Sequence, residues 1–181
     1  MRLRFLRACL LPVLSMGCGL PASPTAPTAP TVTPPSRAEP IVLEAEAGSG
    51  EGDLMHRSRA SGALTIHLAP GQRRRWTFTA AHPSRYAVLV TYANDNPGES
   101  EVLQVEVDGE SIGSLRAQDT GDDGEGWNVF VADLAGEPML GTGIHTVTVE
   151  STGGDGCIEI DLITLRPDVT VYAPRAIPGR P

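Results

Sequence analysis

The fold is decided by one stretch of the chain, Arg85-Tyr86-Ala87-Val88-Leu89-Val90-Thr91-Tyr92-Ala93. Large apolar side chains recur at every second position from Tyr86 to Tyr92, which is the period of a β-strand with one buried face. Runs with the same period continue along residues 41–166, and no 11-residue window carries a helical stripe. The sequence therefore predicts an all-β domain.

Nine antiparallel strands are predicted, separated by turns rich in glycine, proline, asparagine and aspartate. They span Ile41 to Ala47, Ala63 to Ala69, Arg75 to Ala80, Arg85 to Ala93, Glu101 to Val107, Ile112 to Ala117, Trp127 to Asp133, Ile144 to Glu150, and Cys157 to Leu165. The pair Asp108-Gly109, between two alternating runs, predicts a tight hairpin. Many short strands with one apolar face each are typical of a β-sandwich, in which two sheets pack over one core.

The N-terminal residues have the features of an export signal. Residues 1–17 contain three arginines followed by an apolar run that is too short to cross a bilayer. The segment Leu14-Ser15-Met16-Gly17-Cys18 resembles the bacterial lipobox, which implies lipid attachment at Cys18; ordinary signal-peptidase cleavage after Ala22 is the alternative. We therefore expect an exported protein, attached by its lipid at the outer membrane or cell surface, or otherwise secreted or periplasmic.

Two proline-rich segments flank the predicted domain. Residues 18–40 begin with the candidate lipid-acceptor cysteine and consist largely of Pro, Thr and Ala, a composition that favours extended conformations and cannot form a core. Residues 167–181 form a second Pro-rich segment. The first segment predicts a linker that holds the domain at residues 41–166 away from the membrane surface.

Charge excludes several partners and chemistries. The chain of 181 residues carries a formal net charge of −8, and all 14 of its basic residues are arginines. Without lysine there is no Schiff-base or phosphate-loop lysine. An acidic chain also disfavours binding of nucleic acid or of an anionic membrane surface through a basic patch. We expect no nucleic-acid partner, and membrane contact only through the lipid.

Three carboxylates are placed where a partner is required. Glu44 and Glu46 lie two residues apart on a predicted strand and so share a face, and Asp161 lies within the most apolar strand of the chain. A carboxylate in a half-buried strand needs a compensating group. The candidates are an arginine, a backbone amide or a calcium ion.

A polar region is expected near one end of the sandwich. Residues 119–126 form an acidic, glycine-rich loop, for which a solvated turn, a polar ligand contact and calcium binding are all possible interpretations. Asn94-Asp95-Asn96 brackets the same sheet end. Trp127, directly after the acidic loop, is either an aromatic platform for a sugar or a core residue.

No catalytic arrangement is evident. The four histidines are scattered, no serine lies in a nucleophile elbow, and no pair of carboxylates is placed for glycoside hydrolysis. Cys157, which opens an alternating strand, is expected to be a packed structural thiol. The sequence therefore predicts a protein that is not an enzyme.

Five segments in order resemble the β-sandwich carbohydrate-binding modules of families 6 and 35. They are Leu43 to Ala47, Arg85 to Asn94, Val105 to Gly109, Gly143 to Val149, and Ile158 to Ile163. The resemblance implies a galactose-binding-like jelly roll with a structural calcium that joins the first strand to the last. Its ligands would be Glu44, Glu46 and Asp161, completed by backbone carbonyls of residues 58–62. In the sugar site, Trp127 would supply the aromatic platform, Glu159 replaces the asparagine of those families, and a second aromatic residue is missing.

Together these features predict a non-catalytic, calcium-stabilised carbohydrate-binding domain, monomeric and displayed at the cell surface, with a polysaccharide or other glycan as its partner. The residues expected to contact the ligand are Trp127, Asn128, Asn94, Asp119 and Glu159. The alternative is an adhesion, assembly or spacer domain of the same fold that binds protein rather than sugar.

Overall fold

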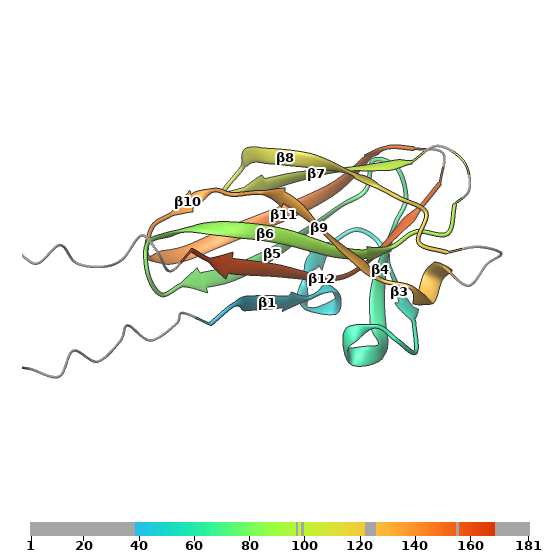
Figure 1. Ribbon diagram of the computed structural model, residues 1–181, viewed down its shortest axis with the longest axis horizontal. Coiled ribbons are helices and arrows are strands. Elements are labelled where there is room, and N and C mark those ends of the chain that lie inside the picture. Colours follow the sequence, from blue (N-terminus) through green and yellow to red (C-terminus); the bar gives the residue numbers. More distant parts are fainter. Residues whose placement is uncertain (1–38, 97, 99, 122–125, 155, 169–181) are drawn as a thin grey trace, which may run out of the picture. The chain divides into compact units, whose positions relative to one another are not determined.

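The computed structural model describes residues 39–96, 98, 100–121, 126–154 and 156–168 (Figure 1). These residues form strands and three short 3-10 helices: η1 (Ala45–Ala47), η2 (Ser61–Ala63) and η3 (Gly126–Asn128). Among the described residues, no helix is long and apolar enough to cross a membrane. The predicted signal peptide, the lipid-acceptor Cys18 and most of both proline-rich segments lie outside the described residues.

The strands form two sheets. Within each sheet, all described neighbouring strands pair antiparallel. The seven-stranded sheet has the order β10-β6-β12-β4-β3, with β1 also paired to β12 and β9 to β6. Its strands are β1 (Ile41–Glu44), β3 (Asp53–His56), β4 (Leu64–Leu68), β6 (Ser84–Ala93), β9 (Val131–Gly136), β10 (Met139–Leu140) and β12 (Ile158–Pro167).

The five-stranded sheet has the order β2-β5-β11-β7-β8. Its strands are β2 (Ser49–Gly50), β5 (Arg73–Ala80), β7 (Glu101–Val107), β8 (Glu110–Ala117) and β11 (Gly143–Gly153). The described part of the chain is therefore the predicted all-β sandwich of two sheets.

Alternating side chains of both sheets form one core. In β6, Tyr86, Val88, Val90 and Tyr92 are all buried, as the period-2 pattern predicts. On the opposite sheet, Val147 and Val149 of β11 are fully buried in the same cluster. Burying each such side chain contributes about 1.5–3 kcal/mol to folding, so the alternation provides the main driving force for joining the two sheets.

All nine predicted strands have counterparts in the structure, and the hairpin at Asp108-Gly109 is confirmed. Both turn residues have positive φ, 52° and 83°, as a two-residue hairpin turn between twisted strands requires. The prediction was wrong in its omissions: β2, β3 and β10 have only two to four residues each. Segments this short carry no periodic pattern to recognise.

Two predicted strand boundaries also need correction. The first strand ends at Glu44, and residues 45–47 turn into η1, so Glu46 does not lie on a strand with Glu44. The strand predicted from Trp127 begins instead at Val131, because Trp127 lies in η3. Both corrections move a predicted site residue from a strand into a tight turn.

Candidate functional site

The three predicted metal-ligating carboxylates approach one another where the first and last strands meet. Glu44 ends β1 and is paired with Leu162 of β12, beside which β1 runs (Figure 1). Asp161 is the extra residue of a β-bulge, since Ile160 and Leu162 pair with consecutive residues of β6. A bulge re-aims the side chain of its extra residue, and here it interrupts the alternation of the most apolar strand at Asp161.

The loop at η2 completes this cluster. The backbone N–H of Ser61 donates to Asp161 Oδ1 at 2.8 Å, and the Ser61 hydroxyl donates to Glu44 Oε1 at 2.8 Å. Gly62 has φ 60°, and a Cβ at this position would lie 2.9 Å from Glu46 Oε1. Ser61 therefore links two of the carboxylates, and the third lies against a glycine that leaves it room.

Negative charge in the cluster is only partly compensated. Glu44 Oε2 and Glu46 Oε2 are buried without a hydrogen-bond partner among the described residues. Burial, together with the charges of Glu44 and Glu46, raises the pKa of Asp161 to about 6, against one opposing hydrogen bond from Ser61. Of the partners considered for Asp161, a backbone amide is present, but no ion pair among the described residues involves these carboxylates.

This cluster fits a hard cation in the chemistry of its donors, since buried, unpaired carboxylate oxygens are the ligands that calcium prefers. Within the described ranges, no group of three or more His, Cys, Asp or Glu side chains is arranged, as it stands, to hold a metal ion. Three carboxylates with no positive partner repel one another. Two observations therefore indicate that a cation would be favourable here: carboxylate oxygens without hydrogen-bond partners among the described residues, and the raised pKa of Asp161.

Trp127 lies on the outside of the seven-stranded sheet's end and is not part of the core. Its side chain is only partly buried, and it is absent from the buried hydrophobic cluster. The Arg57 guanidinium carbon lies 5.6 Å from the centre of the indole, within cation–π range. The His67 ring lies 5.9 Å away at an interplanar angle of 51°. The indole is therefore held by polar neighbours rather than by core packing.

Beneath this tryptophan, Glu159 is fully buried and bound by the protein itself. Arg57 donates two hydrogen bonds to its carboxylate, one from Nε to Oε2 at 2.7 Å and one from Nη2 to Oε1. The Thr65 hydroxyl donates to Oε2 at 2.8 Å. The bond to Glu159 raises the pKa of Arg57. In this arrangement Glu159, predicted to contact a ligand, positions Arg57 beneath the indole.

Arg57 is the residue that sequence reasoning missed. It comes from the loop between β3 and η2 and reaches a carboxylate 102 positions further along the chain. The available signal was indirect: a glutamate in an apolar strand needs donors, and in a lysine-free chain arginine is one candidate to supply them. His67 also lies close, with Nδ1 3.6 Å from Glu159 Oε1, and this nitrogen is buried without a hydrogen-bond partner.

The other predicted ligand residues have different positions. Asn128 lies next to Trp127 in η3, and its Oδ1 accepts a long hydrogen bond of 3.4 Å from the Ser58 hydroxyl. Asp119 is exposed and accepts the backbone N–H of Gly121 at 3.1 Å. Residues 122–125 of the acidic loop lie outside the described residues. Trp127, Asn128 and Arg57 are thus gathered in one area of the surface.

Asn94 requires a correction, because it is fully buried and presents no surface to a ligand in solvent. It donates to Glu101 Oε2 and, at 3.3 Å, to the Ala117 carbonyl oxygen. The Asn94 backbone N–H also donates to Thr120 Oγ1 at 3.0 Å. A buried carboxylate needs such donors, so Asn94 holds Glu101 and the base of the acidic loop in place.

Cys157 is partly buried and forms no disulfide among the described residues. Burial raises the pKa of its thiol, and the negative charge of Glu101 raises it further. A raised pKa keeps sulfur in the thiol form, which is a poor nucleophile. These surroundings agree with the expectation of a structural thiol.

The sandwich defined above has the fold of carbohydrate-binding modules. A family 35 carbohydrate-binding module from Clostridium thermocellum aligns with a TM-score of 0.59 at 21% identity, over 70% of this chain and 98% of that one. The native structure of a family 35 carbohydrate-binding module from the same organism gives a TM-score of 0.62 at 19% identity, over 72% of this chain and 100% of that one.

The same fold occurs within enzymes. An exo-β-1,3-galactanase from Phanerochaete chrysosporium, solved with β-1,3-galactotriose, aligns over 72% of this chain and 30% of that chain, with a TM-score of 0.59 at 23% identity. No family model matches the sequence, and no curated protein matches it. At these identities the comparisons establish the fold, a β-sandwich of the family 35 type.

Proposed function

We propose that this chain is a non-catalytic, calcium-stabilised carbohydrate-binding domain. The observation that carries the proposal is the position of Trp127: a large aromatic ring outside the core, braced by Arg57 and beside the amide of Asn128. An indole face binds the C–H surface of a sugar by burial and dispersion, and neighbouring polar groups bond its hydroxyls. The carbohydrate-binding-module fold supports the same conclusion.

In this proposal Arg57 has two tasks. It neutralises the buried Glu159, and it holds one face of the indole so that the ring does not rotate when a sugar leaves. A platform fixed in advance loses little conformational freedom on binding. Asn128 presents its amide next to the ring and is restrained by Ser58.

Calcium would be held by Glu44, Glu46 and Asp161. When bound, it supplies positive charge to carboxylate oxygens that are otherwise buried without a partner. Because Glu44 comes from β1 and Asp161 from β12, the same ligands would also fasten the start of the domain to its last strand. This role of calcium would be structural. It would explain why the three carboxylates lie together, and it does not require them to contact sugar.

Display at the cell surface is also part of the proposal. Its basis is the sequence before residue 41: an export signal, the lipid-acceptor candidate Cys18 and a Pro/Thr-rich linker. Such a linker would hold the sandwich clear of the lipid surface, where long glycans are accessible.

Glycan-array binding tests the sugar proposal. Wild-type protein in calcium should bind at least one glycan class, and Trp127→Ala should lose that binding while keeping its melting temperature. The matched control is Ile144→Ala, which removes an apolar side chain that is 76% exposed on the other sheet. Equal binding by all three proteins would remove the platform from the proposal.

The alternative, a domain that binds protein, is favoured by one specific feature. Val131 and Leu134 on the edge strand β9, and Val129 just before it, expose 36–53% of their side-chain surface. Edge strands with exposed apolar residues are used for protein contacts. A blank glycan array in calcium, together with a partner captured by wild type but not by Leu134→Asp, would favour this function.

A further inference from the structure

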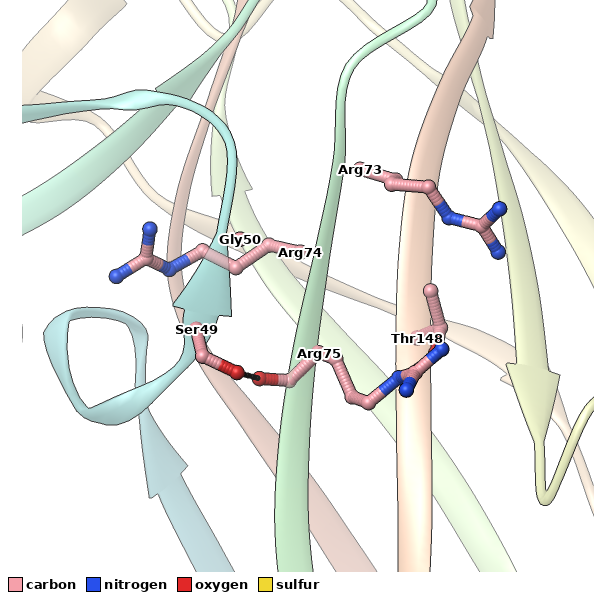
Figure 2. Close-up of a pocket in the computed structure, with 6 residues that line it drawn as sticks. All are labelled: Ser49, Gly50, Arg73, Arg74, Arg75 and Thr148. Carbon is pink, nitrogen blue, oxygen red and sulfur yellow. Dashed lines mark hydrogen bonds between the residues drawn. The ribbon is translucent and has the colours of Figure 1, made fainter.

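An arginine-lined pocket lies on the five-stranded sheet, whereas Trp127 lies beside the seven-stranded sheet. It has a volume of about 210 Å³ and is formed by strands β2, β5 and β11. Figure 2 shows that Arg73 and Arg75 extend from β5 to one side, towards β11, whereas Arg74 extends to the other. The lining residues are Ser49, Gly50, Arg73, Arg74, Arg75 and Thr148.

Arg74 contributes to the lining of the pocket, but its guanidinium extends to the other side of β5 from those of Arg73 and Arg75 and is bound by the protein itself. Only 8% exposed, it donates to three backbone carbonyl oxygens, those of Ala45 at 3.2 Å, Glu51 at 3.2 Å and Gly48 at 2.7 Å. Among the described residues it has no carboxylate partner within 4.0 Å. Three carbonyl oxygens hold the Arg74 guanidinium, so the donors offered to a ligand come from Arg73 and Arg75.

Arg75 is exposed, and its side chain makes one long hydrogen bond to the residues that the structure describes, from Nε to Thr148 Oγ1 at 3.4 Å. Within the part of the chain that the structure describes, it forms no ion pair. Its guanidinium therefore keeps donors for a ligand.

Arg73 is half-exposed and only loosely paired, at 3.6 Å to Glu106 and 3.9 Å to Glu150. Exposed pairs of this length hold the side chain weakly. Arg73 can exchange these contacts for a better-placed anion without leaving a buried charge behind.

We propose that this pocket binds a single oxyanion, a carboxylate or a sulfate ester, carried by a sugar. Guanidinium groups bind such oxyanions through paired N–H donors, which gives both charge and direction. The chain's net charge of −8 disfavours a long polyanion, and the pocket is smaller than the roughly 300–1,000 Å³ of usual small-molecule sites. That the anion belongs to a sugar rests on the proposed function; the pocket itself does not involve Trp127.

The experiment compares ligands that differ only at the charged group. Galactose, galacturonate and galactose 6-sulfate are titrated into the full chain by NMR or calorimetry, with inorganic sulfate as a free-anion probe. The variants are Arg75→Gln and Arg73→Gln. Arg85→Gln is the matched control, because Arg85 is 52% exposed on the other sheet.

Wild type should bind at least one of the two acidic sugars, more weakly as salt increases. Arg75→Gln should weaken this binding by about tenfold or more, the loss of a charge-assisted hydrogen bond, and Arg85→Gln should not. No binding of either acidic sugar, binding of inorganic sulfate alone, or equal losses in Arg75→Gln and Arg85→Gln would overturn the proposal. Acidic-sugar binding that needs Arg75 but survives Trp127→Ala would support this pocket even if the Trp127 platform failed.

Discussion

The pH dependence of stability tests the carboxylate cluster most sharply. In the fold, burial and the neighbouring Glu44 and Glu46 raise the pKa of Asp161 from 3.8 to about 6. Between these values the folded state binds a proton that the unfolded state has released. Without calcium, the contribution of Asp161 to the free energy of unfolding should therefore be highest below pH 3.8. It should fall as pH rises through the folded pKa of about 6.

The size of this effect follows from the shift. At 1.36 kcal/mol per pKa unit, a rise from 3.8 to about 6 corresponds to at most about 3 kcal/mol, or about 10 °C in melting temperature for a domain of this size. Calcium should restore stability above pH 6, because it binds the deprotonated carboxylate. At a hundredfold excess over Kd it would add about 2.7 kcal/mol.

The assay is chemical and thermal unfolding between pH 4 and 8, in chelator and in calcium, followed by the fluorescence of the buried Trp76. Asp161→Asn removes the titrating group and should abolish both the decline with pH and the response to calcium. Asp53→Asn, at an exposed position on β3, is the control and should keep both. A wild type that melts identically in chelator and calcium at pH 7.5 would refute this reasoning.

Three further predictions concern other parts of the chain. His145 Nδ1 lies 2.6 Å from Asp108 Oδ2; the bond raises the pKa of His145, so the stability it adds is complete below pH 6.5 and is lost as pH rises through the folded pKa. His145→Gln should accordingly destabilise the fold more at pH 6 than at pH 9, measured by urea unfolding. Arg57→Gln should cost about 3 kcal/mol in the same assay, since it leaves Glu159 buried without its cation; a loss below 1 kcal/mol would contradict the assigned pairing. Cys18→Ala should abolish incorporation of labelled fatty acid, and unchanged labelling would exclude this cysteine as the acceptor.

The strand pattern was predictable because it is local. In β6, from Arg85 to Tyr92, buried positions alternate with less buried ones, so this run is enough to reveal a strand and its buried face. The hairpin at Asp108-Gly109 is equally local, since two residues with positive φ must occur together in the turn. The strands β2 and β10, with two residues each, were missed because two residues have no period.

The candidate sites depend on contacts that local patterns do not contain. Glu46 was assigned to a strand because alternating residues surround it, whereas the chain turns into η1 directly after Glu44. Asp161 stands out in the sequence as a charge within an apolar strand, but the bulge that turns it away from the alternating faces depends on pairing with β6. The role of Arg57 depends on a partner 102 residues away.

Asn94 was predicted to contact a ligand at the surface, but it lies inside the fold. An Asn-Asp-Asn segment beside an acidic loop suggests a polar surface, yet the first asparagine is fully buried, because Glu101 is buried and needs donors. Which member of a polar segment points inward depends on the burial of a residue elsewhere. The composition of a segment does not contain the burial of a residue elsewhere, so it cannot predict which asparagine contacts the surface.

Whether Trp127 is a sugar platform can be decided by one titration. A glycan selected by array binding is titrated into wild type and into Trp127→Ala in the presence of calcium. Trp127→Ala should lose about 2 kcal/mol or more of binding free energy, about thirtyfold in Kd, with its melting temperature unchanged. A variant that binds the same glycan with the wild-type Kd would contradict this role of Trp127.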